Sequence, residues 1–99
     1  MSAYVISEVE VLDEALAEVY KELAAASIAK YGGRYLARGA EAEVVEGAQT
    51  TRRMVIVEFP SIEQARHWYS STAYAEALRV REAALDRRLI FVEGITIKT

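Results

Sequence analysis

Arg53-Met54-Val55-Ile56-Val57-Glu58-Phe59 is a strand with two apolar faces, and Pro60 ends it. Alternation places Val55, Val57 and Phe59 on one face and Met54, Ile56 and Glu58 on the other. The chain's own helices can cover one of these faces. A second apolar face on a chain of 99 residues needs another cover, and the simplest cover is a second copy of the same chain. The stretch therefore predicts a homodimer through the sheet face, with Glu58 at the interface.

Composition narrows the class of partner. A chain of this length forms one domain, which we place at residues 3–97. The net charge of −3 argues against nucleic acid, which needs a concentrated basic face. No apolar run is long enough to span a bilayer and no signal peptide is visible, so we expect no membrane partner and a cytoplasmic location. The chain has no cysteine and a single histidine, His67, which excludes thiolate and multi-histidine metal sites within one chain. We expect no metal site and no cofactor.

The chain before this strand shows three further elements. Residues 4–11 alternate as a first strand. Asp13 is placed to cap a helix that Gly32 ends, because glycine tolerates the left-handed conformation at a helix C-terminus. Residues 34–39 read as the second strand, and a polar connection with a short strand extension at Val44-Val45 leads to residue 53.

The chain after Pro60 completes the pattern. Ser61 and Gln64 match a capping box that begins a short helix, and a break at residues 70–72 separates this helix from a second one. Residues 89–97 alternate as the last strand. The order predicts an α+β fold of ferredoxin-like type, βαββαβ with a helix pair in the second crossover. Right-handed crossovers favour a four-stranded antiparallel or mixed sheet of order 4-1-3-2, and we expect its first and third strands to be parallel central neighbours.

Several short motifs carry a family resemblance, in the order Tyr31-Gly32-Gly33-Arg34-Tyr35-Leu36, Arg38-Gly39, Glu46-Gly47, Glu58-Phe59-Pro60-Ser61, Trp68-Tyr69, Tyr74 and Glu93-Gly94. From about Ala3 to Gly94 the chain resembles the bacterial family called domain of unknown function 1330. The resemblance implies a dimeric α+β barrel, in a superfamily that also holds cofactor-independent antibiotic-biosynthesis monooxygenases, muconolactone isomerases and some haem proteins. It implies no particular activity. The chain departs from the family's pattern at Ala40, Ser70 and Ala73, where the family tends to have a glycine and two acidic residues.

Strand direction turns the pattern into a candidate site. With parallel first and third strands, Glu8 and Glu58 would lie toward the same end of the sheet. Arg34 would lie beside Glu58, because the second strand is antiparallel to the third. Alternation would put these groups on the face away from the helices, together with Ile6, Leu36, Arg38, Ile56 and Phe91. The helix that begins at Ser61 would bring His67, Trp68 and Tyr69 to the rim.

Glu58 has three interpretations at this stage. As an interface carboxylate beside Arg34, it forms an ion pair that fixes the register of the dimer. As a carboxylate over an apolar floor, it has a pKa raised by desolvation and acts as a general base, a role for which Glu8 is the second candidate. The third interpretation is a plain ligand contact.

The other candidates also have two interpretations each. His67 is an exposed residue of a short helix, or else an acid/base group or an axial haem ligand. Trp68, Tyr69 and Tyr74 belong to helix packing or stack on a substrate, and the Tyr74 hydroxyl is able to close a buried hydrogen bond. Four arginines alternate with acidic residues as on a solvated helix face and receive no function: Arg79, Arg81, Arg87 and Arg88.

The leading functional hypothesis is a homodimeric small-molecule-binding domain with a cavity between the sheet face and the helices. Glu58 and Arg34 would be its polar handles, and the ligand would be a small organic acid or an aromatic molecule. A cofactor-independent isomerase or monooxygenase with a carboxylate base is the first alternative. A structural dimer without a ligand is the second.

Overall fold

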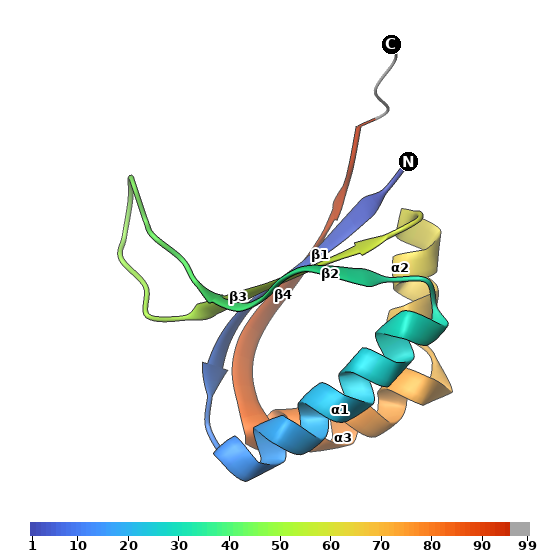
Figure 1. The fold of residues 1–99 in the computed structure, drawn as a ribbon, viewed down its shortest axis with the longest axis horizontal. Helices are drawn as coiled ribbons and strands as arrows, with labels where there is room; N and C mark the ends of the chain where they lie inside the picture. Colours follow the sequence, from blue (N-terminus) through green and yellow to red (C-terminus); the bar gives the residue numbers. More distant parts are fainter. Residues whose placement is uncertain (96–99) are drawn as a thin grey trace.

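The computed structural model describes residues 1–95. Its elements follow in the order β1 (Ala3–Val11), α1 (Glu14–Lys30), β2 (Arg34–Glu41), β3 (Arg53–Phe59), α2 (Ile62–Tyr69), α3 (Thr72–Ala84) and β4 (Leu85–Glu93). With α2 and α3 both in the second crossover, this is the predicted βαββαβ arrangement. The helices lie on one side of a single curved sheet, and the opposite face of the sheet is left open (Figure 1).

Side-chain caps begin each helix. Asp13 Oδ1 accepts a hydrogen bond from the Leu16 amide at 3.0 Å, as the sequence predicts. Ser61 Oγ accepts from the Gln64 amide at 3.1 Å. The Gln64 side chain does not return to Ser61 and instead donates to the Tyr31 carbonyl at 3.0 Å. Only the first hydrogen bond of the predicted capping box is therefore formed. The Gln64 side chain instead connects α2 to the end of α1.

The strand order is β2-β3-β1-β4, which is the predicted order 4-1-3-2. Every neighbouring pair is antiparallel. The expectation of parallel β1 and β3 is therefore wrong. The crossover through α1 makes β1 parallel to β2, whereas β3 returns from β2 through residues 42–52 and runs against both. A strand inserted between two parallel strands by such a return is antiparallel to each of them.

Two further boundaries differ from the sequence-based expectation. The last strand begins at Leu85, four residues earlier than predicted, because its pairing with β1 extends to Val11 opposite Leu85. It ends at Glu93, and the predicted end at Ile97 lies outside the described residues. Val44-Val45 forms no strand, and β2 ends at Glu41.

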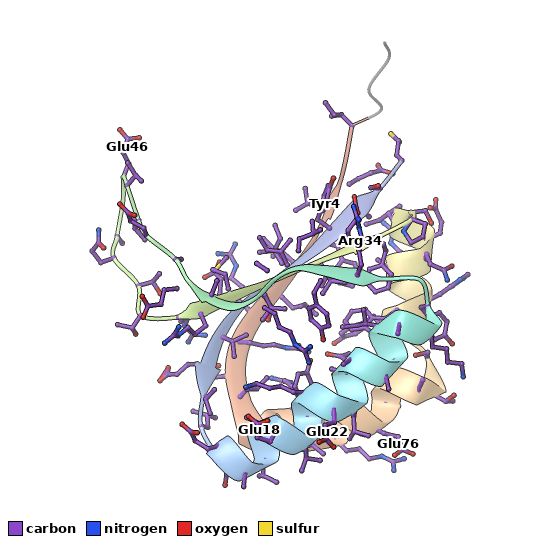
Figure 2. All side chains as sticks on the ribbon, in the orientation of Figure 1. Tyr4, Glu18, Glu22, Arg34, Glu46 and Glu76 are labelled. Carbon is purple, nitrogen blue, oxygen red and sulfur yellow. The ribbon has the colours of Figure 1, made fainter. Side chains whose placement is uncertain are left out.

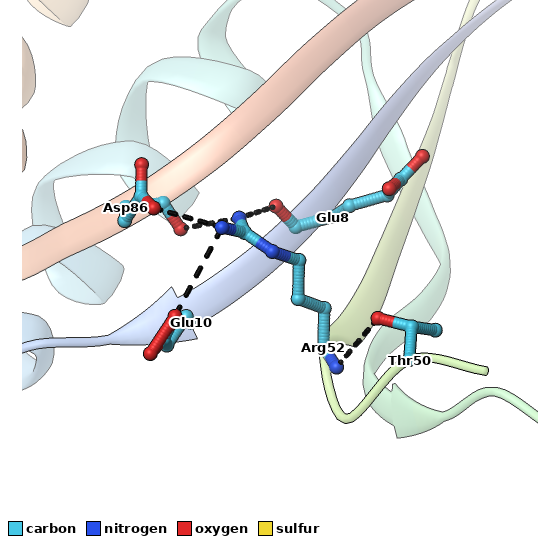
Figure 3. A network of polar contacts seen from close by, with 5 residues as sticks. All are labelled: Glu8, Glu10, Thr50, Arg52 and Asp86. Carbon is cyan, nitrogen blue, oxygen red and sulfur yellow. Dashed lines mark hydrogen bonds and ion pairs between the residues drawn. The ribbon is translucent and has the colours of Figure 1, made fainter. Parts of the chain in front are cut away.

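Arg52 anchors the connection between β2 and β3, whose tip at Glu46 projects beyond the sheet (Figure 2). The Arg52 guanidinium donates to the Asp86 carboxylate at 2.8 Å and to the Glu8 carbonyl at 3.3 Å (Figure 3). It also lies 3.9 Å from the Glu10 carboxylate. One side chain thereby joins the start of β3 to β1 and β4.

The hydrophobic core lies between the inner face of the sheet and the helices, and its buried side chains include Val5, Tyr20, Ile28, Val57, Phe59, Trp68 and Tyr74. Helix α1 packs closely on α3, whereas its backbone keeps away from the strands. This spacing leaves room under the sheet that side chains only partly fill. Within residues 1–95, no helix combines the length and apolar character that a bilayer span requires.

Candidate functional site

The outer face of the sheet, away from the helices, holds the predicted pair of Arg34 and Glu58. These residues lie opposite each other in β2 and β3, and Arg34 Nε donates to Glu58 Oε1 at 2.6 Å. Figure 2 shows Arg34 and Tyr4 pointing away from the helices. The hydrogen bond from Arg34 holds the pKa of Glu58 below its ordinary value, against a smaller opposing effect of burial. Glu58 is thus an ionised, paired carboxylate without the raised pKa that the general-base interpretation requires.

Glu8 does not join this pair. Antiparallel pairing puts Glu58 opposite Tyr4 and Glu8 opposite Met54, so the two carboxylates are four residues apart along the sheet, about 13 Å. The expectation that Glu8 and Glu58 lie toward the same end of the sheet is wrong, because it assumed that β1 and β3 are parallel. Glu8 lies 3.7 Å from Arg88 of β4 instead.

Two side chains expected on the outer face lie on the inner one. Phe91 is opposite Val5, a buried core residue, and packs on the core. Arg38 is opposite Val55, because an irregularity between Tyr35 and Ala37 shifts the register of β2 by one residue. Such a shift moves the following side chains to the other face. The Arg38 guanidinium lies 4.4 Å from the centre of the Tyr35 ring.

The predicted rim residues separate into buried and exposed groups. Trp68 is 2% exposed, and its indole N–H donates to Ser27 Oγ at 2.9 Å. The Tyr74 ring is fully buried and lies 4.1 Å from the Trp68 ring between centroids. Tyr69 is partly exposed at the edge of this aromatic cluster, and His67 is exposed on α2. The structure therefore brings Trp68 and Tyr74 together and keeps His67 apart from them.

A cavity of about 540 Å³ lies between the inner face of the sheet and α1. Its lining residues come from all four strands, α1 and α2, and include Val5, Ser7, Val9, Ala17, Tyr20, Ala24, Tyr35, Arg38, Val55, Val57, Trp68, Arg87 and Leu89. The lining is largely apolar, as ligand cavities of this size usually are. Arg34 and Glu58 do not line this cavity, so its polar groups differ from those that the sequence predicts.

The main polar group beside the cavity is a cluster of two tyrosines and an arginine. Each of these three residues comes from a different element. Tyr20 of α1 and Tyr74 of α3 share a hydrogen bond between their hydroxyls at 2.6 Å. Arg87 of β4 donates to the Tyr20 hydroxyl at 2.6 Å and to the Tyr74 hydroxyl at 2.8 Å. Burial raises the pKa of Tyr74 well above its ordinary value, so its hydroxyl stays protonated. We call these three residues the Tyr-Tyr-Arg cluster.

Ser7 is the second polar group of the lining. It lies on the inner face of β1, is 5% exposed, and its Oγ has no hydrogen-bond partner among the described residues. Ser7 is opposite Leu89 and Arg87 is opposite Val9, which makes Ser7 and Arg87 diagonal neighbours on one face of the sheet. The backbone positions of diagonal neighbours of this kind are about 7–8 Å apart, so both side chains belong to the same part of the cavity lining.

Sequence reasoning missed Tyr20, Arg87 and Ser7 as site residues. The signal for Arg87 is the alternation of Leu85, Arg87, Leu89 and Phe91, which becomes visible only when the last strand begins at Leu85. Ser7 stands between Val5 and Val9 in the same way. A polar side chain in the apolar register of a strand is the sign of an inward polar group in both cases.

Within residues 1–95, no three histidine, cysteine or acidic side chains lie close enough together to hold a metal ion.

Solved structures with the same fold include three informative cases. A protein of unknown function from Rhodopseudomonas palustris is 20% identical, with a TM-score of 0.76 over 97% of this chain and 84% of that one. The cofactor-independent oxygenase SnoaB from Streptomyces nogalater is 11% identical, with a TM-score of 0.67 over 97% and 95% of the two chains. A dimeric ferredoxin-like protein of unknown function from Bacteroides fragilis is 12% identical, with a TM-score of 0.64 over 94% and 96%.

A search of curated proteins finds no match. The family model of the domain of unknown function DUF1330 matches residues 2–95, nearly the whole described chain. The motifs from Tyr31 to Gly94 that carry the resemblance all lie inside this match. The chain therefore belongs to the DUF1330 family of domains of unknown function.

Proposed function

We propose that this protein is a homodimeric small-molecule-binding domain whose ligand occupies the cavity between the sheet and α1. The observation that carries the proposal is the cavity itself, about 540 Å³ with an apolar lining and a few convergent polar groups. The ligand is a small organic acid or an aromatic molecule, because Trp68 and the valines offer apolar surface and Arg87 offers a positive charge.

The dimer in this proposal uses the outer face of the sheet. Its apolar side chains come from three neighbouring strands: Tyr4, Ile6, Met54, Ile56, Ile90 and Val92. The ion pairs of Arg34 with Glu58 and of Arg88 with Glu8 flank this apolar area. A surface with both signs of charge around an apolar centre suits a two-fold interface, in which each patch meets its own copy. The Bacteroides fragilis protein of the same fold is described as dimeric.

The cavity can be tested by filling it. Val55 lines the cavity and is half-buried, so a Val55→Trp chain places an indole ring where the ligand would lie. Equilibrium dialysis with 2-naphthoate and with 2-naphthalenemethanol measures binding. We expect at least one of these probes to bind the parent chain at one molecule per chain, and Val55→Trp to weaken that binding at least about tenfold.

The matched control is Ala83→Trp, which adds the same ring at an exposed position of α3. It should bind the probes as the parent does. Circular dichroism and melting of all three proteins show that the fold is retained. Absence of binding by both probes, or undiminished binding by Val55→Trp, would contradict the proposal.

A second candidate is catalysis in the same cavity without a cofactor, as an isomerase or a monooxygenase. It is supported by the similarity of fold to an oxygenase that works without a cofactor and by the Tyr-Tyr-Arg cluster, whose donors suit a developing oxyanion. A role for Glu58 or Glu8 as the base stays a prediction, and it would place the chemistry on the outer face of the sheet, because neither residue lines this cavity. Turnover that survives chelator treatment and is lost in Glu58→Gln would support that base, whereas loss in Tyr20→Phe alone would place the chemistry in the cavity.

A further inference from the structure

The charge on Arg87 has no anionic partner within the described residues. No carboxylate of residues 1–95 lies at ion-pair distance from its guanidinium, whose bonds go to two neutral phenols. The other charged residues that line the cavity are exposed and carry both signs: Glu14, Glu18, Lys21, Glu22, Arg38 and Arg53. Arg87 is thus the partly buried charge of the lining. A buried charge is costly unless it is paired, so this position favours an anion.

The hydroxyl protons of the cluster point to the same conclusion. Arginine only donates, so Tyr20 and Tyr74 accept from Arg87, and a single hydrogen bond joins the two hydroxyls. One hydroxyl proton lies in that bond, and the other has no acceptor among residues 1–95. Tyr20 lines the cavity, whereas Tyr74 lies behind it. The arrangement that satisfies every group has Tyr74 donating to Tyr20 and Tyr20 donating into the cavity.

Two features make Tyr20 a strong donor. Its oxygen accepts hydrogen bonds from a cation and from a second hydroxyl, and such chains polarise the remaining O–H bond. Ser7 adds a further hydroxyl on the same face of the sheet, and this hydroxyl has no hydrogen-bond partner among residues 1–95. The surrounding wall of Val5, Val9 and Val57 is apolar, so it offers no side-chain polar group that would compete for the anionic oxygen of a ligand.

We propose that the Tyr20 hydroxyl, supported by Arg87 and Tyr74, is an anion-recognition site that together with Ser7 selects ligands with a carboxylate, phenolate or enolate oxygen on an apolar body. The inference rests on the proposed cavity function and adds the chemical class of the ligand. Tyr20 contacts the anionic oxygen directly, whereas Tyr74 is a positioning residue that acts through Tyr20. Arg87 supplies the compensating charge.

Paired probes and paired variants test this assignment. The probes 2-naphthoate and 2-naphthalenemethanol share one apolar body and differ in the charge of their oxygen group. Tyr20→Phe and Tyr74→Phe each remove one hydroxyl from the cluster, but only Tyr20→Phe removes the donor into the cavity. Equilibrium dialysis at neutral pH gives the affinity of each protein for each probe, and melting curves show whether each variant folds.

We expect the parent to bind naphthoate about tenfold or more tightly than the alcohol, because hydrogen bonds to charged groups are the strong ones. Tyr20→Phe should lose about tenfold in naphthoate affinity with little change for the alcohol. Tyr74→Phe should lose less than about threefold, because Tyr20 keeps its bond from Arg87.

The outcomes separate this inference from the function on which it rests. Binding of neither probe by the parent would overturn the cavity function and this assignment with it. Equal affinity for both probes, or equal losses in Tyr20→Phe and Tyr74→Phe, would overturn the anion site alone. If Tyr20→Phe lowers stability and leaves the preference for naphthoate intact, the cluster is only a strut between α1, α3 and β4. Should Tyr20→Phe fail to fold, Arg87→Gln replaces it and should abolish the preference for naphthoate.

Discussion

At the scale of single residues, arginine side chains have different kinds of partner on the two faces of the sheet. Arg34 meets a carboxylate on the outer face, whereas Arg87 meets two phenols on the inner face. The first pair is complete, because each charge has its partner. The second group has no anion at ion-pair distance among residues 1–95 and lies beside the cavity, and in the proposed function a ligand supplies that anion.

The paired state of Glu58 predicts a change in the pH dependence of stability. Its pKa in the folded protein is below 4.5, the value of a free side chain. Ionised Glu58 therefore stabilises the fold above pH 4.5, and this contribution is lost as the pH falls through the folded pKa. Glu58→Gln should lower the unfolding free energy at pH 7, and the difference from the parent should shrink steadily below pH 4.5.

Urea unfolding at a series of pH values measures this difference. Glu76→Gln is the control, because Glu76 is exposed on α3 with no arginine or lysine at ion-pair distance among residues 1–95. It should follow the parent at every pH. If Glu58→Gln and the parent differ by the same amount at pH 3 and pH 7, the ion pair does not contribute in the way described.

At the scale of elements, the junction between α1 and β2 depends on two glycines with different physical tasks. Gly32 has φ +80°, the left-handed conformation that favours glycine, and its amide donates to the Ala29 carbonyl. The Gly33 amide donates to the Ile28 carbonyl at 2.9 Å, which completes a Schellman motif. The sequence-based interpretation of Gly32 as the end of the helix agrees with this geometry.

Gly33 also permits close packing, which gives a prediction for Gly33→Ala. A Cβ atom at this position would lie 2.7 Å from Ile28 Cγ2 and 2.8 Å from Phe59 Cε1, both side chains of the core. Relieving such overlap costs about 1–3 kcal/mol of stability. Denaturant unfolding of Gly33→Ala should show this loss without a change in the cooperativity of the transition.

A control for backbone effects is Ala29→Gly, in the last turns of α1 at an exposed position. It changes backbone freedom without adding a contact and should cost about 1 kcal/mol or less. If Gly33→Ala is as stable as the parent, the packing of Ile28 and Phe59 against the junction is looser than the structure describes.

At the scale of the whole molecule, the helices cover only one face of the sheet (Figure 1). Ile56 lies near the centre of the uncovered face, opposite Ile6 of β1. In the proposed dimer, Ile56→Lys would place a charge in the middle of the interface. Loss of a central contact of this kind costs about 2 kcal/mol or more, which raises the dimer Kd roughly thirtyfold.

Light scattering coupled to size-exclusion chromatography, over a dilution series, measures this change. Val19→Lys is the matched control, because Val19 is an exposed apolar residue of α1, 46% accessible and away from the sheet face. It should leave the dimer intact. A parent chain that is monomeric at micromolar concentration, or a Val19→Lys chain that dissociates as readily as Ile56→Lys, would rule out the sheet-face dimer.

The sequence by itself determined the order of helices and strands along the chain, the order of strands in the sheet and the partner of Arg34. The helices and strands follow from local rules, because alternation and capping residues act over short stretches of chain. The strand order and the pair of Arg34 with Glu58 follow from chain connectivity, because the start of β2 lies beside the end of the antiparallel β3. The alternation of residues 53–59 likewise predicts that this strand has two apolar faces.

Apart from the pair of Arg34 and Glu58, the tertiary structure decided which polar groups meet. The direction of β3 separated Glu8 from Glu58, and one irregularity in β2 moved Arg38 to the inner face. The meeting of Tyr20, Tyr74 and Arg87 depends on how far α1 stands from the sheet, which only the packing of α1 on α3 sets. Distances between elements arise from the summed volumes of many side chains, so no short pattern in the chain encodes them.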